Sequence, residues 1–582
     1  MSRQANFSRA RVVPATAIFS AAALLSATLL FAAAAPAQQP VAANSVAPSR
    51  VAANKAALKK FVDASNKISP EVSKHLSRGL QNYLRYANAV VNGAAPTGKF
   101  AAPNFAASKQ KKVGWNPWNL IPVSDPALDQ AAQGYTQNTT SSAWCGNSIV
   151  VGYEDSGAFF RTDPNAAFGV PLSFNGVSYS ENAGKSFTDS GFLTPGTFSA
   201  NVLLGDPVVT CSSPTHFQYA SIMNTTTPDG IDPLIGPSVS FSTNEGKTWS
   251  APVQAVSLDG NSQLADNPWL AVDPTDTQRL YLSYTQIDFL ACNSINVVSS
   301  SDGGKKWSAP VVIDQECIPT DPTAIQNTVA GSSVTVGPDG KVFVAYEFFP
   351  GALPNPPVNN EIKFASSTNH GAAFSKPRRI ASLVPSGTGV ELNGHLQVTE
   401  YPHIAVDRSP GPSRGTIYVV YPDGRNRVMA DANSASGRYA YPDIFLAKST
   451  NSGRSFSILG GVSRTQKDFR GVGRDQFLPG VAVDKDGEVA VCYYDRRNDS
   501  ADLRVDRFCS VSNNQGKTWT DQRASNVHWL PSLNADPLNS GPAYGISEYD
   551  ALTSEFMLHG DGFFGAFIVE ISGNQNVVAT KF

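Results

Sequence analysis

From about residue 134 onward, hydrophobic positions recur as short runs bounded by Gly, Pro, Asn and Asp. The runs come in pairs, which read DNPWLAVDP and RLYLSYTQ, then YPHIAVDRS and TIYVVYPD, then DQFLPGVAVDKDG and VAVCYYD. Each run alternates or is continuously apolar over the length of one β-strand. The pattern predicts an all-β region built from repeated antiparallel strand pairs.

A short polar phrase containing glycine follows most of these strand pairs. Successive copies start 58 to 82 residues apart, a spacing near the length of a four-stranded blade with its loops. Regular recurrence at this length indicates a repeat architecture. The six copies are SENAGKSF from Ser180, STNEGKTW from Ser242, SSDGGKKW from Ser300, STNHGAAF from Ser367, STNSGRSF from Ser449 and SNNQGKTW from Ser512.

Each phrase is predicted to form the turn between the third and fourth strands of a unit. The Asn or Asp side chain can accept backbone N–H bonds, Gly can take a positive φ, and the aromatic ring can pack between strands. Five copies have Asn at the third position, and only Asp302 keeps the acid. Both residues supply an acceptor oxygen, so we expect the phrase to be structural and not catalytic.

The pattern Ser-x-Asp/Asn-x-Gly-x-x-Trp/Phe resembles the Asp-box, or bacterial neuraminidase repeat, of secreted sialidase-like β-propellers. The resemblance covers residues 134–582 and implies a β-propeller of six or seven four-stranded blades. Residues 134–526 parse into six units, and residues 541–582 contain three further strands. These strands either form a seventh blade, completed by a strand near Trp115–Val123, or close the first blade of a six-bladed ring. Strand counting favours seven slightly, whereas the resemblance favours six.

The N-terminal part of the chain has a different pattern. An apolar run at about residues 15–34 follows three arginines and ends at Ala35-Pro36-Ala37, which predicts a signal peptide over residues 1–37, with an uncleaved membrane anchor as the alternative. A linker is expected over residues 38–54 and a helical or irregular segment over residues 55–133. Two helical stripes occur there, the second beginning at Ser69-Pro70-Glu71. This segment is interpreted as a helical hairpin on the propeller, a poorly ordered leader or a pro-segment covering the site.

Charge and cysteine content narrow the class of partner and the compartment. A net charge of -2 and an isoelectric point near 6.4 give no basic face for nucleic acid. Six cysteines in an exported chain predict disulfides, and Cys492 with Cys509 is the best pair because they lie on neighbouring strands. We therefore expect a secreted or periplasmic protein, without a membrane partner after signal cleavage, and a monomer.

Candidate chemistry lies in the loops that gather around one mouth of a propeller channel. The resemblance implies a glycosidase-like set there: Asp206 or Asp266 as the acid and Glu548 with Tyr549 as the nucleophile pair. It also implies substrate-binding residues, because guanidinium groups suit carboxylates: Arg425, Arg496 and Arg497, with Asp423 and Asp495 beside them.

No metal site is predicted from the spacing of the histidines, and no cofactor is expected. A ring of acidic residues around the channel has the oxygen ligands that Ca2+ takes, so calcium is the one cofactor kept as an alternative. Insertions at about residues 383–397 and 424–441 lengthen the fifth unit and are expected to form a wall of the pocket or a lid.

The sequence thus predicts an exported propeller that acts on or binds a glycan or glycoconjugate, with glycoside hydrolysis as the candidate reaction. The alternative is a non-catalytic propeller that binds glycan or protein partners. Sialidases begin with an Arg-Ile-Pro motif that this sequence lacks. We therefore expect sialosides to be cleaved poorly or not at all.

Overall fold

The computed structural model describes much of the chain after residue 47, in segments. The predicted signal peptide and most of the predicted linker lie outside the described residues. The described ranges are 48–73, 75–92, 111–112, 120–125, 137–155, 173–194, 201–321, 323–351, 359–386, 391–430, 438–463, 473–525, 527–531, 544–557, 559–571 and 574–582.

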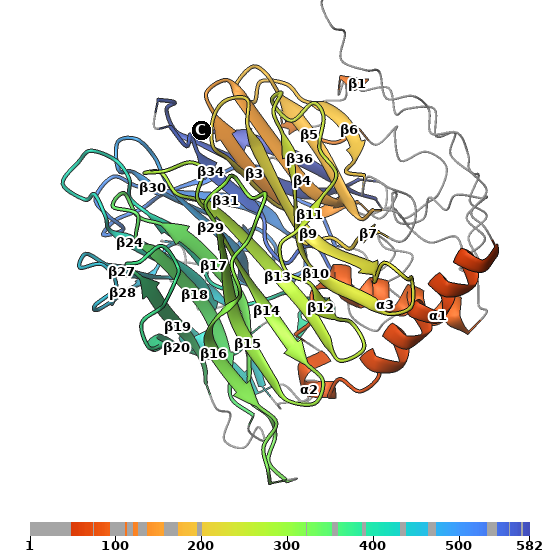
Figure 1. Ribbon diagram of the computed structural model, residues 1–582. Helices are drawn as coiled ribbons and strands as arrows, with labels where there is room; N and C mark the ends of the chain where they lie inside the picture. Colours follow the sequence, from red (N-terminus) through yellow and green to blue (C-terminus); the bar gives the residue numbers. More distant parts are fainter. Residues whose placement is uncertain are drawn as a thin grey trace, which may run out of the picture. The chain divides into compact units, whose positions relative to one another are not determined.

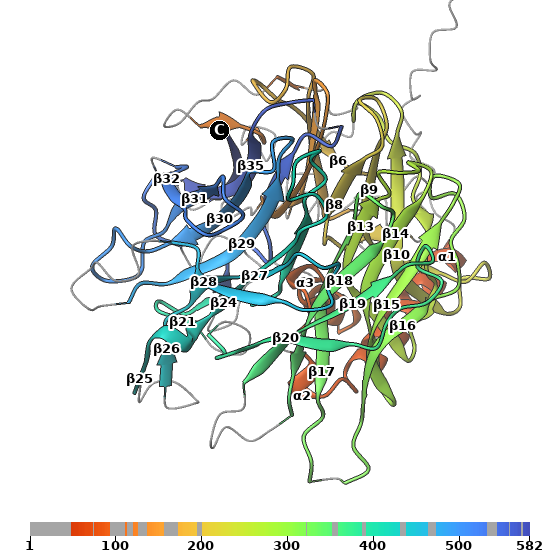
Figure 2. The same ribbon diagram turned by 90° about the vertical axis from the view of Figure 1, so that its left-hand side faces the viewer.

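Seven antiparallel sheets follow one another along the chain and form a seven-bladed β-propeller (Figures 1 and 2). The first three blades, each given from its innermost strand outward, are as follows. Blade one has β3 (Gln137–Cys145), β4 (Ser148–Asp155), β5 (Asn175–Ser180), β6 (Thr188–Phe192) and β1 (Lys111–Lys112). Blade two has β8 (Val208–Cys211), β9 (Phe217–Thr226), β10 (Pro233–Ser242) and the short strands β7 (Val202–Leu203), β11 (Val253–Gln254) and β12 (Leu258–Asp259). Blade three has β13 (Gln263–Val272), β14 (Leu280–Asp288), β15 (Cys292–Ser300) and β16 (Val311–Cys317).

The remaining four blades each have four strands. Blade four has β17 (Thr328–Val336), β18 (Val342–Phe349), β19 (Asn360–Ser367) and β20 (Arg378–Leu383), and blade five has β23 (His403–Val406), β24 (Ile417–Asp423), β27 (Asp443–Ser449) and β28 (Ser457–Gly461). Blade six has β29 (Gln476–Val483), β30 (Val489–Asp495), β31 (Asp506–Ser512) and β32 (Thr520–Arg523). Blade seven has β34 (Ala551–Ser554), β35 (Phe563–Ile571), β36 (Asn574–Lys581) and β2 (Ile121–Pro122).

The last blade settles the number of blades at seven. Its three C-terminal strands are completed by β2, within the stretch Trp115–Val123 proposed for this role, and Ile121 pairs with Ala579. The ring closes where Trp144 of blade one forms a bridge with Glu555, next to β34. Strands from before residue 134 therefore belong to the propeller, and the six-bladed alternative is wrong. Strands from both ends of the chain thus complete the last blade and close the ring.

The six repeat phrases all form the predicted turn, which we call the repeat turn. In the copy at Ser242, the Asn244 side chain accepts a 3.0 Å hydrogen bond from the Thr248 backbone N–H, and Gly246 adopts a φ of 85°. Asp302 accepts the corresponding bond from Lys306 at 2.9 Å. Since amide and carboxylate oxygens serve equally here, the turns have a structural role.

Three disulfides use all six cysteines. Cys492–Cys509 joins β30 to β31, which confirms that prediction. Cys292–Cys317 joins β15 to β16, and Cys145–Cys211 links the innermost strands of blades one and two. Two of the disulfides join strands within one blade, and Cys145–Cys211 joins two neighbouring blades.

The N-terminal segment folds as α1 (Pro48–Ser65), α2 (Pro70–Ser73) and α3 (Arg78–Val91), grouped beside one end of the blades (Figures 1 and 2). Helix α1 begins inside the stretch expected to be a linker. The second predicted helix is broken in two, because Ser77 caps α3 by accepting from the Leu80 N–H at 3.3 Å. None of the described helices is long and apolar enough to cross a bilayer.

The insertions of blade five form small sheets of their own. Strands β21 (Glu391–Leu392) and β22 (Leu396–Gln397) pair with each other, and β22 runs parallel to β33 (Tyr544–Gly545). Strand β25 (Val428–Ala430) pairs with β26 (Arg438–Ala440), after the short helix η1 (Gly424–Asn426). These elements lie at the ends of the blades where the inner strands begin. Their role as a wall of the pocket or a lid stays a prediction.

Candidate functional site

The inner strands begin at the end of the channel that carries the polar candidates. Four of them, β3, β13, β17 and β29, have a β-bulge near this end. Thr139, Asn267, Gly331 and Leu478 lie in these bulges with φ between 47° and 64°, and Asp206, which precedes β8, has a φ of 53°. A bulge bends its strand and re-aims the side chains. This end of the channel thereby gathers polar groups from separate blades.

Four acidic residues from four blades meet there, and we call them the carboxylate cluster: Glu154, Asp206, Asp266 and Glu548. Each is at most 3% exposed. The Asp206 N–H donates to Glu154 Oε1 at 3.2 Å. The Asn267 N–H lies 3.2 Å from Asp206 Oδ2 and 3.1 Å from Asp266 Oδ1, and its side-chain amide donates to Glu548 Oε2 at 3.3 Å. Asn267 thus connects three of the four carboxyl groups.

Two of the buried carboxyl groups, those of Asp206 and Asp266, have raised pKa values. Burial raises the pKa of Asp206 well above its usual range, and the charges of Glu548, Asp266 and Glu154 add to the effect. Burial also raises the pKa of Asp266, to about 6, against hydrogen bonds from Ser77. Two neighbouring carboxyl groups therefore have pKa values raised toward or beyond the range that acid–base catalysis at neutral pH uses.

A layer of aromatic rings borders the cluster. The Tyr549 ring lies 5.2 Å from Trp269, whose ring lies 4.8 Å from His403. Burial lowers the pKa of His403 to about 4, and the charge of Arg507 lowers it further, so the imidazole is neutral. The Tyr549 hydroxyl donates to the Pro207 carbonyl at 3.1 Å, and burial raises its pKa well above the usual value. In this state Tyr549 packs as a core residue, and its role as a nucleophile stays a prediction.

The chain between α2 and α3 covers the cluster. The Ser77 N–H donates a 2.7 Å hydrogen bond to Asp266 Oδ2. The Tyr401 hydroxyl donates to the His75 carbonyl at 2.9 Å. A Cβ atom on Gly79 would lie 2.4 Å from the Leu204 carbonyl oxygen, so only glycine fits at this contact.

The cover shares one hydrophobic core with the propeller. Leu76 and Leu80 of the cover pack in the same cluster as Leu264 and Tyr284 of blade three. The Tyr83 hydroxyl accepts a 2.6 Å hydrogen bond from the Asn224 amide. Of the three interpretations of this segment, a helical hairpin packed on the propeller is the observed one, and it also lies over the predicted site.

A second buried acidic pair lies between blades four and five. Glu347 accepts a 2.9 Å hydrogen bond from the Asn360 amide, and Glu400 accepts one from the Ser386 N–H. Burial raises the pKa of Glu347 well above its usual range, and the charge of Glu400 adds to the shift. This pair contacts different residues from those that join the carboxylate cluster.

The predicted substrate-binding arginines lie in blades five and six and hold their own strand ends. Arg497 Nε donates to Asp495 Oδ2 at 2.8 Å, and Arg497 also bonds Asp521 at 2.9 Å. Arg425 repeats the arrangement with Asp423, its Nε donating at 2.7 Å. The structure thus brings each Asp–x–Arg pair together within one strand end, and it does not bring them to the carboxylate cluster.

Arg496 is committed to a different contact. Its side chain is 1% exposed and forms a 2.8 Å ion pair with Asp475. Tyr439, from the hairpin inserted in blade five, donates to the same Asp475 at 2.6 Å. Arg496 therefore ties blade six to the inserted wall, and substrate binding by the three arginines stays a prediction.

The described residues contain no group of three or more His, Cys, Asp and Glu side chains placed to hold a metal ion. The carboxyl groups of the cluster are joined through Asn267 and Ser77 instead. Calcium at the channel stays a prediction from the sequence.

Two residues of the site escaped the sequence analysis. Asn267 directly follows Asp266, but nothing in the local sequence indicated the β-bulge that turns its side chain toward Glu548. Ser77 lies within an apolar helical stripe, where the pattern Ser-Arg-Gly-Leu could have indicated a new helix start.

No protein-family model matches the chain, and no curated protein sequence matches it. Solved structures that resemble it include an ulvan lyase, a polysaccharide lyase with 9% identity and a TM-score of 0.47, covering 81% of this chain and 95% of that one. A Hadza microbial sialidase has 12% identity and a TM-score of 0.38, covering 70% and 73%. An α-L-arabinofuranosidase of Fusarium graminearum has 12% identity and a TM-score of 0.41, covering 68% and 97%. These are likenesses of fold alone.

Proposed function

We propose that the protein is an exported β-propeller that hydrolyses a neutral glycan with the carboxylate cluster. The observation that carries the proposal is the adjacency of Asp206 and Asp266, two buried carboxyl groups with raised pKa values at one mouth of the channel. Glycoside hydrolysis needs one carboxyl group that donates a proton and one carboxylate that acts on the opposite side.

The roles follow from the two pKa shifts. Burial and the charges of Glu548, Asp266 and Glu154 raise the pKa of Asp206 well above its usual range, which makes Asp206 the candidate general acid. It would protonate the leaving oxygen as the glycosidic bond breaks. Asp266, with a pKa of about 6, is ionised at neutral pH and is the candidate base for the attacking water or the candidate nucleophile. Glu548, held by Asn267, would stabilise positive charge developing on the sugar ring.

The charge of the site favours a neutral sugar over a sialoside. Neither Asp206 nor Asp266 forms an ion pair with a described cationic side chain, whereas Arg425 and Arg497 are engaged by Asp423 and Asp495. A carboxylate-bearing sugar placed beside the cluster would meet negative charge without a guanidinium partner. The absence of the Arg-Ile-Pro motif supports the same choice.

The cover is part of the proposal. Ser77 occupies the side of Asp266 that a substrate hydroxyl would take, so catalysis requires this segment to move or to be removed. This makes residues 75–80 a pro-segment-like cover on a site that is closed in the described state. Three disulfides suit an oxidising compartment, which agrees with the export predicted from residues 1–37.

The test is a substrate panel with and without the cover displaced. Gly79→Leu would drive α3 away from the Leu204 carbonyl and from Glu154 Oε1, which a Cβ atom would approach to 2.8 Å, while leaving the side chains of Asp206 and Asp266 in place. Asn88→Leu, exposed on the same helix, is the matched control. The panel contains neutral polysaccharides, neutral aryl glycosides and aryl α-sialosides. We expect Gly79→Leu to cleave a neutral substrate and no sialoside.

Two results would redirect the proposal. Efficient sialoside cleavage would contradict the choice of a neutral glycan. If folded Gly79→Leu neither cleaves nor binds any glycan of the panel, the chain is better interpreted as a propeller that binds a protein partner.

A further inference from the structure

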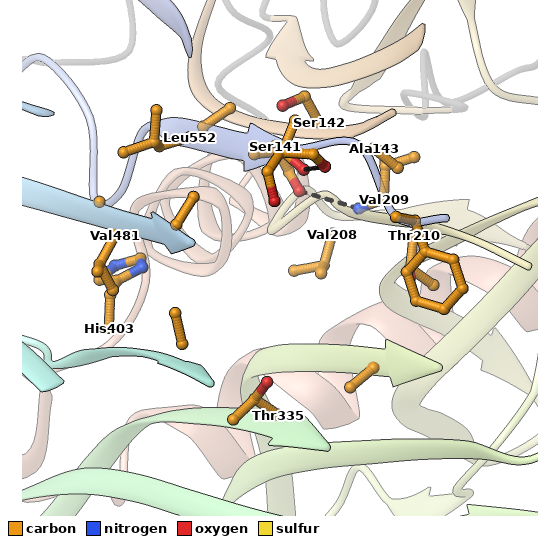
Figure 3. Close-up of a pocket in the computed structure, with 18 of the residues that line it drawn as sticks. Ser141, Ser142, Ala143, Val208, Val209, Thr210, Thr335, His403, Val481 and Leu552 are labelled. Carbon is orange, nitrogen blue, oxygen red and sulfur yellow. Dashed lines mark hydrogen bonds between the residues drawn. The ribbon is translucent and has the colours of Figure 1, made fainter. Parts of the chain in front are cut away.

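The opposite end of the channel holds a cavity of about 200 Å3 that the proposed function does not use. All seven inner strands line it, and Figure 3 shows Ser141, Thr210, Thr335 and Val481 arranged around one open space. These residues belong to the later halves of their strands, nearer the repeat turns. Trp269 and His403 of the aromatic layer also line the cavity, so the layer borders it on the side of the carboxylate cluster.

The wall of this cavity is polar because of how the blades are built. Each inner strand is the terminal strand of its sheet, so one edge of its backbone faces the channel without a partner strand. Such an edge presents N–H and C=O groups. The cavity can therefore hydrogen-bond a polar ligand from several sides.

One cationic side chain lines the cavity among the described residues, that of Arg408, just after β23. The central carbon of its guanidinium group lies 4.6 Å from the centre of the Phe556 ring, which also lines the cavity. Stacking over a phenyl ring orients the guanidinium plane but satisfies none of its N–H donors.

Glu555 is the acidic residue whose charge acts on Arg408, and its carboxylate already accepts hydrogen bonds from backbone N–H groups. Glu555 accepts backbone N–H bonds from Gly146 and His559, both at 2.7 Å, and from Met557 at 3.1 Å. No described carboxylate forms an ion pair with Arg408. Burial lowers the pKa of Arg408 to about 10, with the charge of Glu555 acting in the opposite direction.

We propose that Arg408 and Phe556 form a binding site for a small oxyanion-bearing molecule in this end of the channel. The guanidinium fork would hold a carboxylate or sulfate group, the Phe556 ring would pack against the ligand's apolar face, and the strand edges would bond its hydroxyl groups. A half-buried cation without an ion-pair partner among the described residues is unfavourable, so an anion that supplies acceptors binds with a gain in free energy.

The site is independent of the carboxylate cluster in charge and position. The cluster repels anions, whereas the Arg408 end attracts them. The aromatic layer of Trp269 and His403 borders the cavity on the cluster side. Failure of glycan hydrolysis would leave this site untouched, and failure of anion binding would leave the hydrolysis proposal untouched.

The test is calorimetric titration of the full chain with sodium glucuronate and sodium sulfate, and with glucose as the neutral counterpart of glucuronate. We expect saturable binding of one anion per chain and no binding of glucose. Arg408→Gln should weaken the binding by about ten- to a hundredfold, the loss expected for a charge-assisted hydrogen bond. Arg504→Gln, at an exposed arginine of blade six, should leave it unchanged.

Arg408→Lys separates charge from geometry and guards against a folding defect in Arg408→Gln. It keeps the positive charge but loses the planar fork, so it should bind more weakly than wild type and more tightly than Arg408→Gln. Equal binding by wild type and a folded Arg408→Gln would overturn the proposal. So would the absence of binding by wild type, or a crystal grown with glucuronate that places the carboxylate away from Arg408.

Discussion

Ser77 and Asp266, 189 residues apart in the chain, meet through a 2.7 Å hydrogen bond from the Ser77 N–H to Asp266 Oδ2. The bond joins the start of α3 to a carboxyl group of the cluster. Because this donor is a backbone group, the bond depends on the break between α2 and α3. The Ser77 side chain adds hydrogen bonds of its own to Asp266 and Asp206.

Ser77→Pro would remove this donor, since proline has no backbone N–H. We expect the free energy of unfolding to fall by about 1–3 kcal/mol beyond that of Ser77→Ala. Ser77→Ala keeps the N–H and loses the hydroxyl that caps α3 and hydrogen-bonds to Asp206 and Asp266, which Ser77→Pro loses as well. Urea unfolding of the two variants measures the difference. Equal stability of the two would show that the bond to Asp266 contributes nothing.

Asp266 should make stability depend on pH. Its pKa of about 6 in the folded protein exceeds the ordinary unfolded value of about 3.9, so the folded state binds more protons between these values. The free energy of unfolding should therefore fall as pH rises from about 4 to 6, by on the order of 3 kcal/mol from this group. Denaturant titrations across this range measure the slope.

Asp266→Asn should remove that part of the slope. Asp302→Asn is the matched control, because Asp302 is only half-buried in a repeat turn. Hydrogen bonds from the Lys306 N–H and Ser300 lower its pKa, which places its titration below pH 4. A slope that survives in Asp266→Asn would assign the pH dependence to other buried acids, such as Asp189, whose pKa burial raises to about 7.

The repeat turns were predictable because everything that stabilises them is local. The Asn or Asp oxygen, the Ser hydroxyl and the glycine lie within eight residues of sequence, as at Ser242–Trp249. The number of blades required a strand, β2, whose Pro122 pairs with Val578, 456 residues away in the chain. Only the apolar pattern at both ends of the chain suggested this pairing.

The site was predictable in part for the same reason. Asp206 and Asp266 were found because they begin inner strands, which a repeat places at one end. The cover over them was not, since the stripe from Val72 to Ala87 looks like one continuous helix until the contact to Asp266 is known. Arg425 and Arg497 were proposed to bind substrate, but the structure shows local ion pairs. Asp423 and Asp495, two residues before them in the sequence, bind their side chains.

A matched pair of glycines tests the packing of the repeat turns. Gly453 has a φ of 78°, and a Cβ atom there would lie 2.3 Å from the Phe364 ring, whereas Gly460 has a φ of 82° and open space. Gly460→Ala should cost about 1–2 kcal/mol for its backbone conformation, and Gly453→Ala about 1–3 kcal/mol more for overpacking. Denaturant unfolding that ranked the two equally would contradict the packing account.

Arg497 and Arg425 should differ in their structural importance. The Arg497 side chain is 11% exposed and Arg425 is 37% exposed, and each pairs with a buried Asp. Arg497→Gln leaves Asp495 buried without its partner and should cost about 3–5 kcal/mol, whereas Arg425→Gln should cost less. If Arg497→Gln has the same free energy of unfolding as wild type but loses glycan binding, Arg497 binds the substrate.

The most direct test of the central claim compares Gly79→Leu with the double variant Gly79→Leu/Asp206→Asn on the neutral glycan that the panel identifies. The measurement is the initial rate of release of reducing sugar at neutral pH. The account predicts a rate for Gly79→Leu well above that of wild type, and a fall of about two to four powers of ten on removing the Asp206 proton donor. An equal rate in the folded double variant would show that the carboxylate cluster is not the reaction centre.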